Sequence, residues 1–482
     1  MLATTDRDSL LAELRALLGE AGLRHPVDDA DPALQDHRRM YRGRALAVAA
    51  PRDTAEVAAL MRLCHARRVA VVPQGGNTGY SGGATPDASG TQLLVSLRRL
   101  ARIRDLDTAN FTLTAEAGCT LQAVQDAASA AGRYFPLSLG SQLSCQIGGN
   151  LATNAGGIHV LRFGMMRDLV LGVEAVLPDG SVYAGLNALR KDNTGYDLPG
   201  LLIGSEGTLA IFTAATLKLW PAQQATATAA VAVTDAQAAV DLLAVLRAQA
   251  GERLVAFELM PAATLALLRR ELPELRQPFA TPPPMTVLCE LGSGASEPLE
   301  AMLAAALDSP TARPLVRDAV LAGSERERAE LWRMRESVSE AQRRGVASLK
   351  HDIAVPPAAI PAFMQRVQAW CAAQQPDAEL VCYGHAGDGN LHCNLNARPG
   401  ADRAAFLARE AAVRDAIHGM VREFHGSISA EHGIGQAKVD ELPRYVPAEK
   451  LALMRRLKSA IDPRGIMNPG KLLRMPPTSA SD

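Results

Sequence analysis

Long apolar runs are absent from this sequence. None approaches the roughly 20 residues that a membrane-spanning helix needs, so the sequence predicts no transmembrane segment. Residues 1–8 also lack the basic-then-apolar layout of a secretory signal. We therefore expect a cytoplasmic protein.

Cysteine is scarce, and neither sign of charge dominates. The seven cysteines form no C-x-x-C pair, which argues against a disulfide framework and against an iron–sulfur cluster. The formal net charge of -1 does not indicate binding to nucleic acid or to an anionic membrane. No G-x-G-x-x-G motif follows a predicted strand, so a nicotinamide dinucleotide in a Rossmann domain has no support.

The length and the pattern of elements indicate more than one domain. A chain of 482 residues exceeds the size at which one hydrophobic core usually keeps growing. From residue 45, short apolar strands alternate with helices, and longer strands and helices follow Trp220-Pro221. We place a first domain at 1–221, a second at 222–449, and a C-terminal segment at 450–482 that packs back on the first.

Three stretches of small residues punctuate the first domain, at 73–83, 148–157 and 204–211. Backbone approaches a diphosphate most closely where side chains are absent and successive N–H groups point inward. The stretch at 73–83 follows a predicted strand, although by itself it could be a flexible surface loop. Three such stretches in one half of the chain indicate a long dinucleotide or multi-phosphate ligand.

The most informative motif is the segment 384–394, which carries His385 and His392 and is followed by Glu431. Two imidazoles and a carboxylate with glycine turns between them are the usual parts of a divalent-metal site with an open position. Residues 390–394 are predicted to form a strand, after a glycine-rich loop that returns His385 toward the same place. The alternative interpretation is a pair of buried structural histidines, with 429–435 as a plain surface loop.

Two other motifs are rejected. Residues 465–471 have the spacing of a phosphate-binding P-loop, but Leu472 stands where a hydroxyl must hold magnesium. Residues 79–83 fit the G-x-S-x-G nucleophile elbow, which would make Ser81 the nucleophile of a serine hydrolase. An elbow requires a helix directly after the serine, and Gly82, Gly83 and Pro86 oppose one.

Taken in order along the chain, these motifs resemble those of the FAD-linked 2-hydroxy-acid dehydrogenases of the vanillyl-alcohol oxidase superfamily. The resemblance extends from about residue 30 to Leu472. It implies an α+β fold with a two-subdomain FAD-binding domain of the vanillyl-alcohol oxidase type. It also implies an α+β substrate (cap) domain with an antiparallel sheet, and a C-terminal tail that returns to the FAD domain.

The resemblance assigns the small-residue stretches to FAD. Because the first loop has no histidine, we expect FAD to be bound without a covalent bond. The cofactor-binding residues that the resemblance implies are Pro73, Gly75, Gly76, Asn77, Thr78, Gly79, Ser141, Gly148, Gly149, Asn150, Thr153, Asn154, Gly157, Gly204, Glu206, Gly207, Ile211 and Asn468.

The resemblance also assigns roles in the second domain. The residues that would ligate zinc or a similar divalent ion are His385, His392 and Glu431, and those that would hold the substrate's carboxylates are Arg335, Ser339, Lys350 and Asn394. Ser339 stands where the related 2-hydroxyglutarate enzymes carry threonine, and a hydroxyl remains. Arg335 and Lys350 could instead belong to a solvated face. His432 is the candidate general base, because it follows a ligand without being one.

The reaction implied is the oxidation of a D-2-hydroxy acid to the 2-keto acid. D-2-hydroxyglutarate is the expected substrate, with D-lactate and D-malate as alternatives within the family. Electrons would pass to a separate acceptor, such as an electron-transfer flavoprotein, a quinone or a cytochrome. A non-redox FAD-dependent transferase is the alternative from a different class. The sequence leaves the oligomeric state open, a homodimer included.

Overall fold

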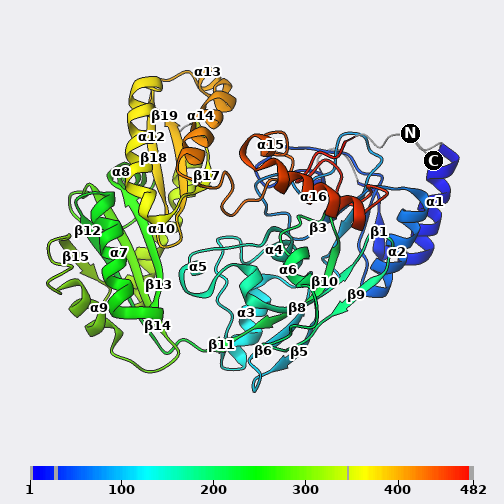
Figure 1. Ribbon diagram of the computed structural model, residues 1–482, viewed down its shortest axis with the longest axis horizontal. Coiled ribbons are helices and arrows are strands. Elements are labelled where there is room, and N and C mark those ends of the chain that lie inside the picture. Colours follow the sequence, from blue (N-terminus) through cyan, green and yellow to red (C-terminus); the bar gives the residue numbers. More distant parts are fainter. Residues whose placement is uncertain (1–3, 27–30, 345–346, 477–482) are drawn as a thin grey trace. The chain divides into compact units, whose positions relative to one another are not determined.

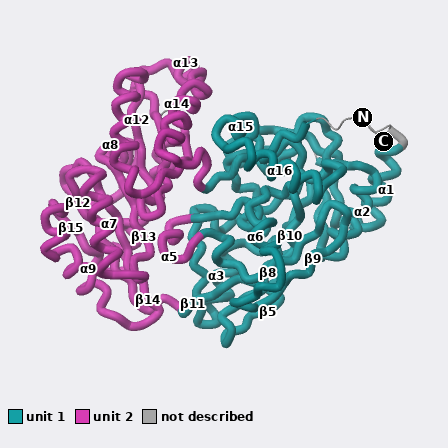
Figure 2. Tube along the Cα trace, in the orientation of Figure 1, with its two compact units in different colours: residues 1–156, 165–221, 431–482 teal, residues 157–164, 222–430 magenta. Residues whose placement is uncertain are grey.

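The computed structural model describes residues 4–26, 31–344 and 347–476. The chain divides into two compact units, which Figure 2 shows in different colours. Unit 1 comprises residues 1–156, 165–221 and 431–482, and unit 2 comprises residues 157–164 and 222–430. The chain therefore crosses from unit 1 to unit 2 after residue 221, where the sequence predicts a domain boundary. It returns to unit 1 for the last time after residue 430, whereas the sequence-based boundary is at 449.

Unit 1 is built on separate sheets (Figure 1). In its described part, a four-stranded sheet has the order β1-β2-β4-β3, and β4 is parallel to both β2 and β3. A five-stranded antiparallel sheet has the order β5-β6-β10-β8-β9, and β11 pairs with β7. The strands are β1 (Leu23–Arg24), β2 (Ala47–Ala49), β3 (Val71–Gln74), β4 (Leu93–Ser96), β5 (Ile103–Asp107), β6 (Thr112–Glu116), β7 (Arg133–Tyr134), β8 (Val170–Val176), β9 (Val182–Gly185), β10 (Ile211–Lys218) and β11 (Trp220–Pro221).

Capping residues define both ends of helix α2 in unit 1. Helix α2 begins after Asp53, whose carboxylate accepts the backbone N–H of Glu56 at 2.8 Å, and it ends at Arg68 in the left-handed conformation. Asp53 thus supplies the helix start expected between the first two strands. The helices of this unit are α1 (Thr4–Leu18), α2 (Thr54–Arg67), α3 (Leu121–Ala130), α4 (Ile147–Thr153), α6 (Leu198–Leu202), α15 (Leu442–Tyr445) and α16 (Ala448–Ile461).

The small-residue stretch at 148–157 begins as a helix, α4, rather than as a loop. Glycine is a poor helix former, but a side chain does not fit here. A Cβ on Gly148 would lie 2.6 Å from a methyl carbon of Leu97 and 2.9 Å from the Cβ of Ala117. Close packing of α4 on its neighbours therefore outweighs the low helix propensity of its glycines.

The C-terminal tail is joined to unit 1 by main-chain and buried side-chain contacts. Val71 of β3 donates to the carbonyl of Ile466 and accepts from the N–H of Asn468. The Lys458 ammonium donates to Asp462 at 2.6 Å and to the carbonyls of Thr208 and Met467 at 2.7 and 2.8 Å. Burial lowers the pKa of Lys458, and the carboxylate of Asp462 acts in the opposite direction.

Unit 2 is built around one antiparallel sheet (Figure 1). In its described part the sheet has eight strands in the order β15-β12-β14-β13-β18-β19-β16, and β17 also pairs with β19. All residues of β14 are buried, as expected for a strand covered on both faces. The strands are β12 (Ala225–Val233), β13 (Leu254–Pro261), β14 (Met285–Ser293), β15 (Val316–Leu321), β16 (Ser348–Leu349), β17 (Asp352–Ala354), β18 (Ala378–His385) and β19 (Asn390–Ala397).

Helices cover this sheet. Helices α7 and α9 pack on β12 and β14, and α12 packs on β18. Side chains of α8, α10 and α11 form a core cluster with strand residues that include Ala230, Leu288 and Tyr383. The helices of this unit are α5 (Val160–Phe163), α7 (Ala236–Ala250), α8 (Ala262–Glu271), α9 (Leu299–Leu307), α10 (Glu325–Glu336), α11 (Val338–Arg344), α12 (Ile360–Gln374), α13 (Arg403–Ala408) and α14 (Glu410–Glu423).

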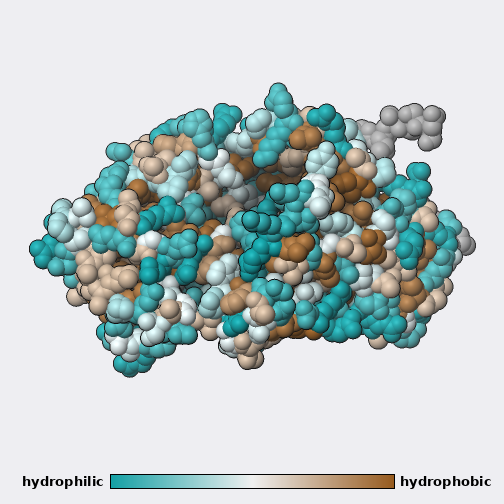
Figure 3. Space-filling view, turned by 60° about the horizontal axis from the view of Figure 1, so that its bottom comes forward, coloured by the Kyte–Doolittle hydropathy of each residue, from teal (hydrophilic) through white to brown (hydrophobic). Residues whose placement is uncertain are grey.

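Hydrophilic and hydrophobic residues are mixed on the surface of the protein. Hydrophilic residues cover much of the face drawn in Figure 3, and hydrophobic ones lie between them. Among the described residues, no helix has both the length and the apolar character that crossing a membrane requires. Every cysteine is buried and unbridged in the part of the chain that is described.

We predict that Lys458→Ala lowers the free energy of unfolding by roughly 3 kcal/mol, because it leaves the carboxylate of Asp462 buried without its cation. The side chains of this pair are 7% and 0% exposed. Urea unfolding measures the change. The control is Arg474→Ala, which breaks an ion pair with Asp440 whose side chains are 57% and 70% exposed. It should cost about 1 kcal/mol or less. Equal losses in the two variants would contradict this account of the tail.

Candidate functional site

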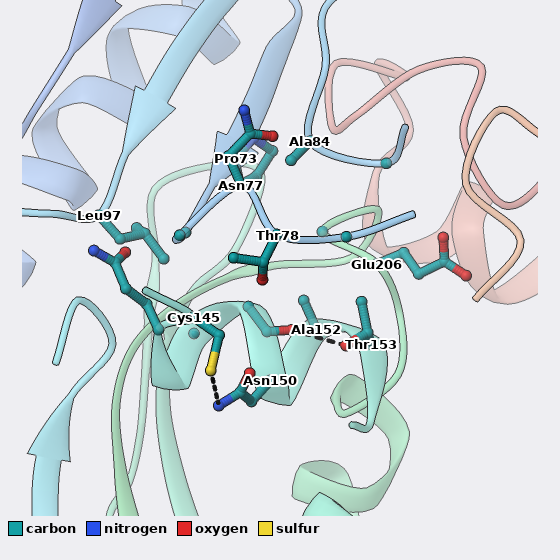
Figure 4. Close-up of a pocket in the computed structure, with 18 of the residues that line it drawn as sticks. Pro73, Asn77, Thr78, Ala84, Leu97, Cys145, Asn150, Ala152, Thr153 and Glu206 are labelled. Atoms are coloured by element: carbon teal, nitrogen blue, oxygen red, sulfur yellow. Dashed lines mark hydrogen bonds between the residues drawn. The ribbon is translucent and has the colours of Figure 1, made fainter. Parts of the chain in front are cut away.

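A cavity opens in unit 1 where its small-residue stretches meet (Figure 4). The loop after β3 lines the cavity through Asn77 and Thr78, and α4 lines it through Asn150 and Thr153. The third stretch contributes Glu206. The three stretches thus enclose a common space, as a ligand that spans them requires.

Glycine permits the close approach of two of these segments. A Cβ on Gly76 would lie 2.0 Å from the carbonyl oxygen of Ser144, and a Cβ on Gly75 would lie 3.1 Å from the backbone nitrogen of Gly149. Real Cβ atoms do not tolerate the first distance, so the backbone of the loop would have to move. Asn77 follows in the left-handed conformation, with φ of 54°, which asparagine adopts more readily than most residues.

Most of the predicted cofactor residues line this cavity. Those in the lining are Pro73, Gly75, Gly76, Asn77, Thr78, Gly79, Gly148, Gly149, Asn150, Thr153, Glu206, Gly207 and Ile211. Among the described residues, Ser141, Asn154, Gly204 and Asn468 of unit 1 are outside the lining, and Gly157 belongs to unit 2.

Sequence reasoning missed part of the lining. The missed residues are Ser81, Gly83, Ala84, Leu97, Cys145, Gln146, Ala152, Ala210 and Phe212. Ser81, Gly83, Ala152 and Ala210 lie inside the three stretches but were not selected. Those that flank the stretches within three residues, and that a wider window would have found, are Ala84, Cys145, Gln146 and Phe212. Leu97 lies just after β4, outside every small-residue stretch, and only the packing of β4 beside β3 brings it here.

Glu206 fixes the segment that follows Glu431. Its carboxylate accepts the backbone N–H groups of Ile434 at 2.8 Å and of Gly435 at 2.6 Å. Burial raises the pKa of Glu206, while these two N–H groups act in the opposite direction. A Cβ on Gly433 would lie 2.8 Å from the Glu206 carboxylate, so glycine is needed where the segment passes it.

Ser81 holds the same segment from the other side. Its hydroxyl lies 2.9 Å from the carbonyl oxygen of His432 and 3.1 Å from that of Gly433, and it donates to them. No helix follows Ser81 in the described residues 82–92. The hydroxyl is thus committed to the backbone, and the nucleophile elbow is absent from this part of the chain.

His432 lines the same cavity. Its ring is edge-on to that of Tyr80, with centroids 4.7 Å apart and an interplanar angle of 76°. The backbone from His432 to Gly435 is held by the contacts of Ser81 and Glu206. The candidate base therefore lies at the space enclosed by the small-residue stretches.

In unit 2, the β18–β19 hairpin carries His385 and His392. Tyr383 is directly opposite His392, and His385 is two residues beyond Tyr383 on the same strand. Side chains of directly opposite residues, and of residues two apart, share a face of the sheet. The two imidazoles are therefore diagonal neighbours, with ring centroids 5.6 Å apart. This confirms the strand predicted at 390–394 and shows that His385 ends the preceding strand.

Glu431 completes the predicted ligand set. It follows Ala430, the last residue of unit 2. One potential ligand atom from each of His385, His392 and Glu431 lies within 4.8 Å of the other two. Two imidazoles and one carboxylate suit zinc and similar divalent ions, and small side-chain rotations would bring all three within bonding range. The residues present thus fit a divalent metal.

Two buried carboxylates lie beside the histidines, and sequence reasoning missed both. Glu258 of β13 is directly opposite His385, whose Nδ1 lies 2.6 Å from its Oε1. Asp352 of β17 is directly opposite His392, whose Nδ1 lies 3.8 Å from its Oδ1. Metal-binding histidines usually direct their second nitrogen at such a group. The signal in the sequence was a single acid in each strand, inside β13 for Glu258 and at the start of β17 for Asp352.

Glu258 also contacts Arg335, whose Nε donates to its Oε2 at 2.6 Å. Burial raises the pKa of Glu258, but the charges of Arg335 and His385 outweigh burial and lower it to about 2. Glu258 is therefore a carboxylate at neutral pH, and it connects a predicted substrate residue to a predicted metal ligand.

The other predicted substrate residues also belong to unit 2. Ser339 of α11 has its hydroxyl 3.5 Å from that of Tyr383, and Lys350 lies between β16 and β17. Asn394 is 3% exposed; its Oδ1 accepts the N–H of His351 and its Nδ2 donates to Gln342. A substrate contact at Asn394 would have to share these bonds.

Comparisons with known proteins bear on both units. Residues 222–472 match the family described as FAD linked oxidases, C-terminal domain, and residues 45–184 match the FAD binding domain family. The chain is 40% identical over 438 residues to a D-2-hydroxyglutarate dehydrogenase of Xanthomonas citri pv. viticola, which covers 91% of each protein. It is 39% identical to the mitochondrial D-2-hydroxyglutarate dehydrogenase of Bos taurus, over 92% of this chain and 80% of that protein.

Solved structures agree on the fold. A p-cresol methylhydroxylase with substrate bound superposes with a TM-score of 0.75 at 15% identity, over 98% of this chain and 97% of that one. An alkyldihydroxyacetonephosphate synthase superposes with a TM-score of 0.71 at 16% identity, over 96% of this chain and 84% of that one. At these identities the likeness shows the fold alone. It confirms the predicted fold class.

We predict that Gly76→Ala lowers the flavin content of the purified protein, because the new Cβ would force the loop away from Ser144. The absorbance ratio of flavin to protein measures the content, and titration of the apoprotein with FAD should show a Kd that is roughly tenfold higher, as for a strain of about 1.4 kcal/mol. The control is Gly140→Ala, whose Cβ would meet nothing within 4 Å. Undiminished flavin in the Gly76 variant would show that the loop position does not matter for binding.

Proposed function

This chain belongs to the FAD-linked oxidase family that includes the D-2-hydroxyglutarate dehydrogenases, and we propose that it oxidises D-2-hydroxyglutarate to the 2-keto acid. It is an FAD-dependent oxidoreductase. The observation that carries the specific proposal is the set of two imidazoles and one carboxylate with ligand atoms within 4.8 Å. A flavin site alone would fit many substrates, whereas a bound cation favours a hydroxy acid that can be chelated.

FAD would occupy the cavity of unit 1, with its pyrophosphate against the backbone of residues 75–79. The bound flavin supplies a hydride acceptor. Binding would be non-covalent, since the loop at 73–83 has no histidine to form a tether. Leu97, Ala210 and Phe212 add apolar surface to the lining, which suits an aromatic ring system.

His385, His392 and Glu431 would hold a divalent cation, and we propose zinc. A cation there would supply positive charge that makes a nearby hydroxyl easier to deprotonate. The contact with Glu258 occupies Nδ1 of His385, which leaves Nε2 as the ligand atom of this residue.

His432 would take the proton of the substrate's hydroxyl. Oxidation of an alcohol to a ketone removes that proton and a hydride from the adjacent carbon, so a base is required. A neighbouring cation would disfavour the imidazolium form and keep the ring able to accept a proton. The edge-on packing against Tyr80 and the fixed backbone restrict the directions in which this ring can point.

Arg335 and Lys350 would bind the carboxylates of the substrate. Arg335 has five N–H donors in a planar fork, and its Nε–H is directed to Glu258. Two cationic residues favour a dicarboxylate, which ranks D-2-hydroxyglutarate and D-malate above D-lactate. Ser339 would add a hydroxyl donor beside them.

Electrons would leave the flavin for a separate acceptor, an electron-transfer flavoprotein, a quinone or a cytochrome. The sequence has no iron–sulfur or haem attachment motif that could relay them further within this chain.

The experiment that tests the proposed function mixes purified protein with D- and L-2-hydroxy acids without oxygen and follows the flavin absorbance. We expect the absorbance to fade fastest with D-2-hydroxyglutarate, more slowly with D-malate and D-lactate, and not with the L-enantiomers. Treatment with a chelator should abolish the fading, and zinc, manganese or cobalt should restore it.

Two outcomes would contradict the proposal. A flavin that every 2-hydroxy acid leaves oxidised would favour a non-redox role, such as transfer. A flavin that is fully reduced in protein shown to be free of metal would refute the metal assignment.

We predict that His432→Ala slows flavin reduction by roughly two to four orders of magnitude, which is the usual contribution of a general base. Flavin content should be retained, because the variant leaves the glycine-rich lining unchanged. Stopped-flow absorbance measures the rate. The control is His65→Ala, which removes an imidazole from α2 that is outside the cavity lining. Equal reduction rates in the two variants would remove His432 from the role.

A further inference from the structure

We propose that Glu258 is a positioning residue that couples the metal ligand His385 to the substrate-binding residue Arg335. The inference rests on the proposed function, since it assigns Glu258 to the support of two residues named there. Glu258 belongs to unit 2 together with both partners, so these contacts lie inside one unit.

The sheet register brings Glu258 to this place. Residues Glu258 and Leu259 of β13 pair with His385 and Gly384 of β18. The side chains of Glu258 and His385 therefore project from the same face at the shortest cross-strand separation. Glu258 is 0% exposed, so water cannot replace a lost partner.

The two oxygens of the Glu258 carboxylate serve different partners. Oε1 lies 2.6 Å from Nδ1 of His385, and Oε2 lies 2.6 Å from Nε of Arg335. Both distances are short, as expected for charge-assisted hydrogen bonds. A displacement of this one carboxylate would thus move both functional side chains.

The contact with His385 has a chemical consequence. A carboxylate that accepts from Nδ1 selects the tautomer in which Nε2 carries the lone pair, and it makes that nitrogen a stronger metal ligand. The contact with Arg335 sets the direction of the guanidinium. This group lies over the ring of Tyr383, with its Cζ 4.9 Å from the ring centroid. Glu258 therefore prepares the ligand geometry and the carboxylate-binding geometry together.

A purely structural ion pair is the alternative, and the same sheet contains one. Glu290 of β14 is 2% exposed and accepts from Arg328 at 2.8 Å and from Trp332 at 2.6 Å. Arg328, Trp332 and Arg335 lie on one face of α10, at the i, i+4 and i+7 spacing of a helix. Glu290 thus resembles Glu258 in burial, in its place on a strand and in its contact with α10. Its hydrogen-bond partners within the described residues are Thr228, Arg328 and Trp332, and none of them is a proposed metal or substrate residue. It provides a matched control.

The test compares Glu258→Gln with Glu290→Gln in flavin-loaded protein stripped of metal. Zinc affinity is measured by competition with a chromophoric chelator, and kcat and KM for D-2-hydroxyglutarate are measured after zinc is restored. We expect Glu258→Gln to weaken zinc binding by roughly 10- to 100-fold and to raise KM. Glu290→Gln should leave both within about twofold of the unchanged protein, which is near the limit of such measurements.

A second variant keeps the test decisive if Glu258→Gln does not fold. Glu258→Asp keeps the charge but retracts it by one methylene, so it should weaken zinc binding in the same direction and by less than Glu258→Gln. Zinc affinity within about twofold of the unchanged protein in either folded Glu258 variant would overturn the inference, because 1 kcal/mol of ligand support corresponds to more than a fivefold change.

Failure of the inference is distinguishable from failure of the proposed function. An unchanged protein that binds no zinc, or whose flavin is not reduced by any 2-hydroxy acid, would refute the proposed function, and Glu258 would then have no metal ligand to support. An unchanged protein that binds zinc and is reduced, with a Glu258→Gln variant that behaves identically, would refute the inference alone.

Discussion

The antiparallel register of β13, β18 and β19 is the constraint on which the candidate metal site depends. This register puts Glu258 opposite His385 and puts Tyr383 opposite His392, so that the two imidazoles and the carboxylate share a face. A slip of one residue in β19 would turn His392 to the opposite face of the sheet. The placement of the candidate ligands therefore depends on the main-chain pairing of these strands.

A second constraint acts in unit 1, where Glu206 and Ser81 fix the backbone around His432. Both contacts use main-chain groups, so the residue that reaches the cavity is placed by the path of the chain. The same Glu206 lines the cavity itself. The lining of the cavity and the candidate base are thus joined through hydrogen bonds of Glu206, and a change in either is expected to affect the other.

Local patterns allowed much of this to be predicted from the sequence. Helix α2 has its capping Asp53, and the strand at 390–394 has its alternation, so both were predicted; the resemblance supplied the fold class, which the solved structures confirm. The contact of Glu258 with His385 was missed because the two residues are 127 positions apart in the sequence. Strand pairing over that distance leaves no local signal. The helix at Gly148 was missed because tight packing against Leu97, and not propensity, decides it.

The central claim is that His385, His392 and Glu431 bind one divalent cation. X-ray absorption at the zinc edge of the zinc-loaded protein tests it most directly. The account predicts one zinc per chain with two imidazole nitrogens at about 2.0–2.1 Å and an oxygen ligand at about 2.0–2.2 Å. A spectrum without imidazole scattering, or with sulfur ligands at about 2.3 Å, would contradict it.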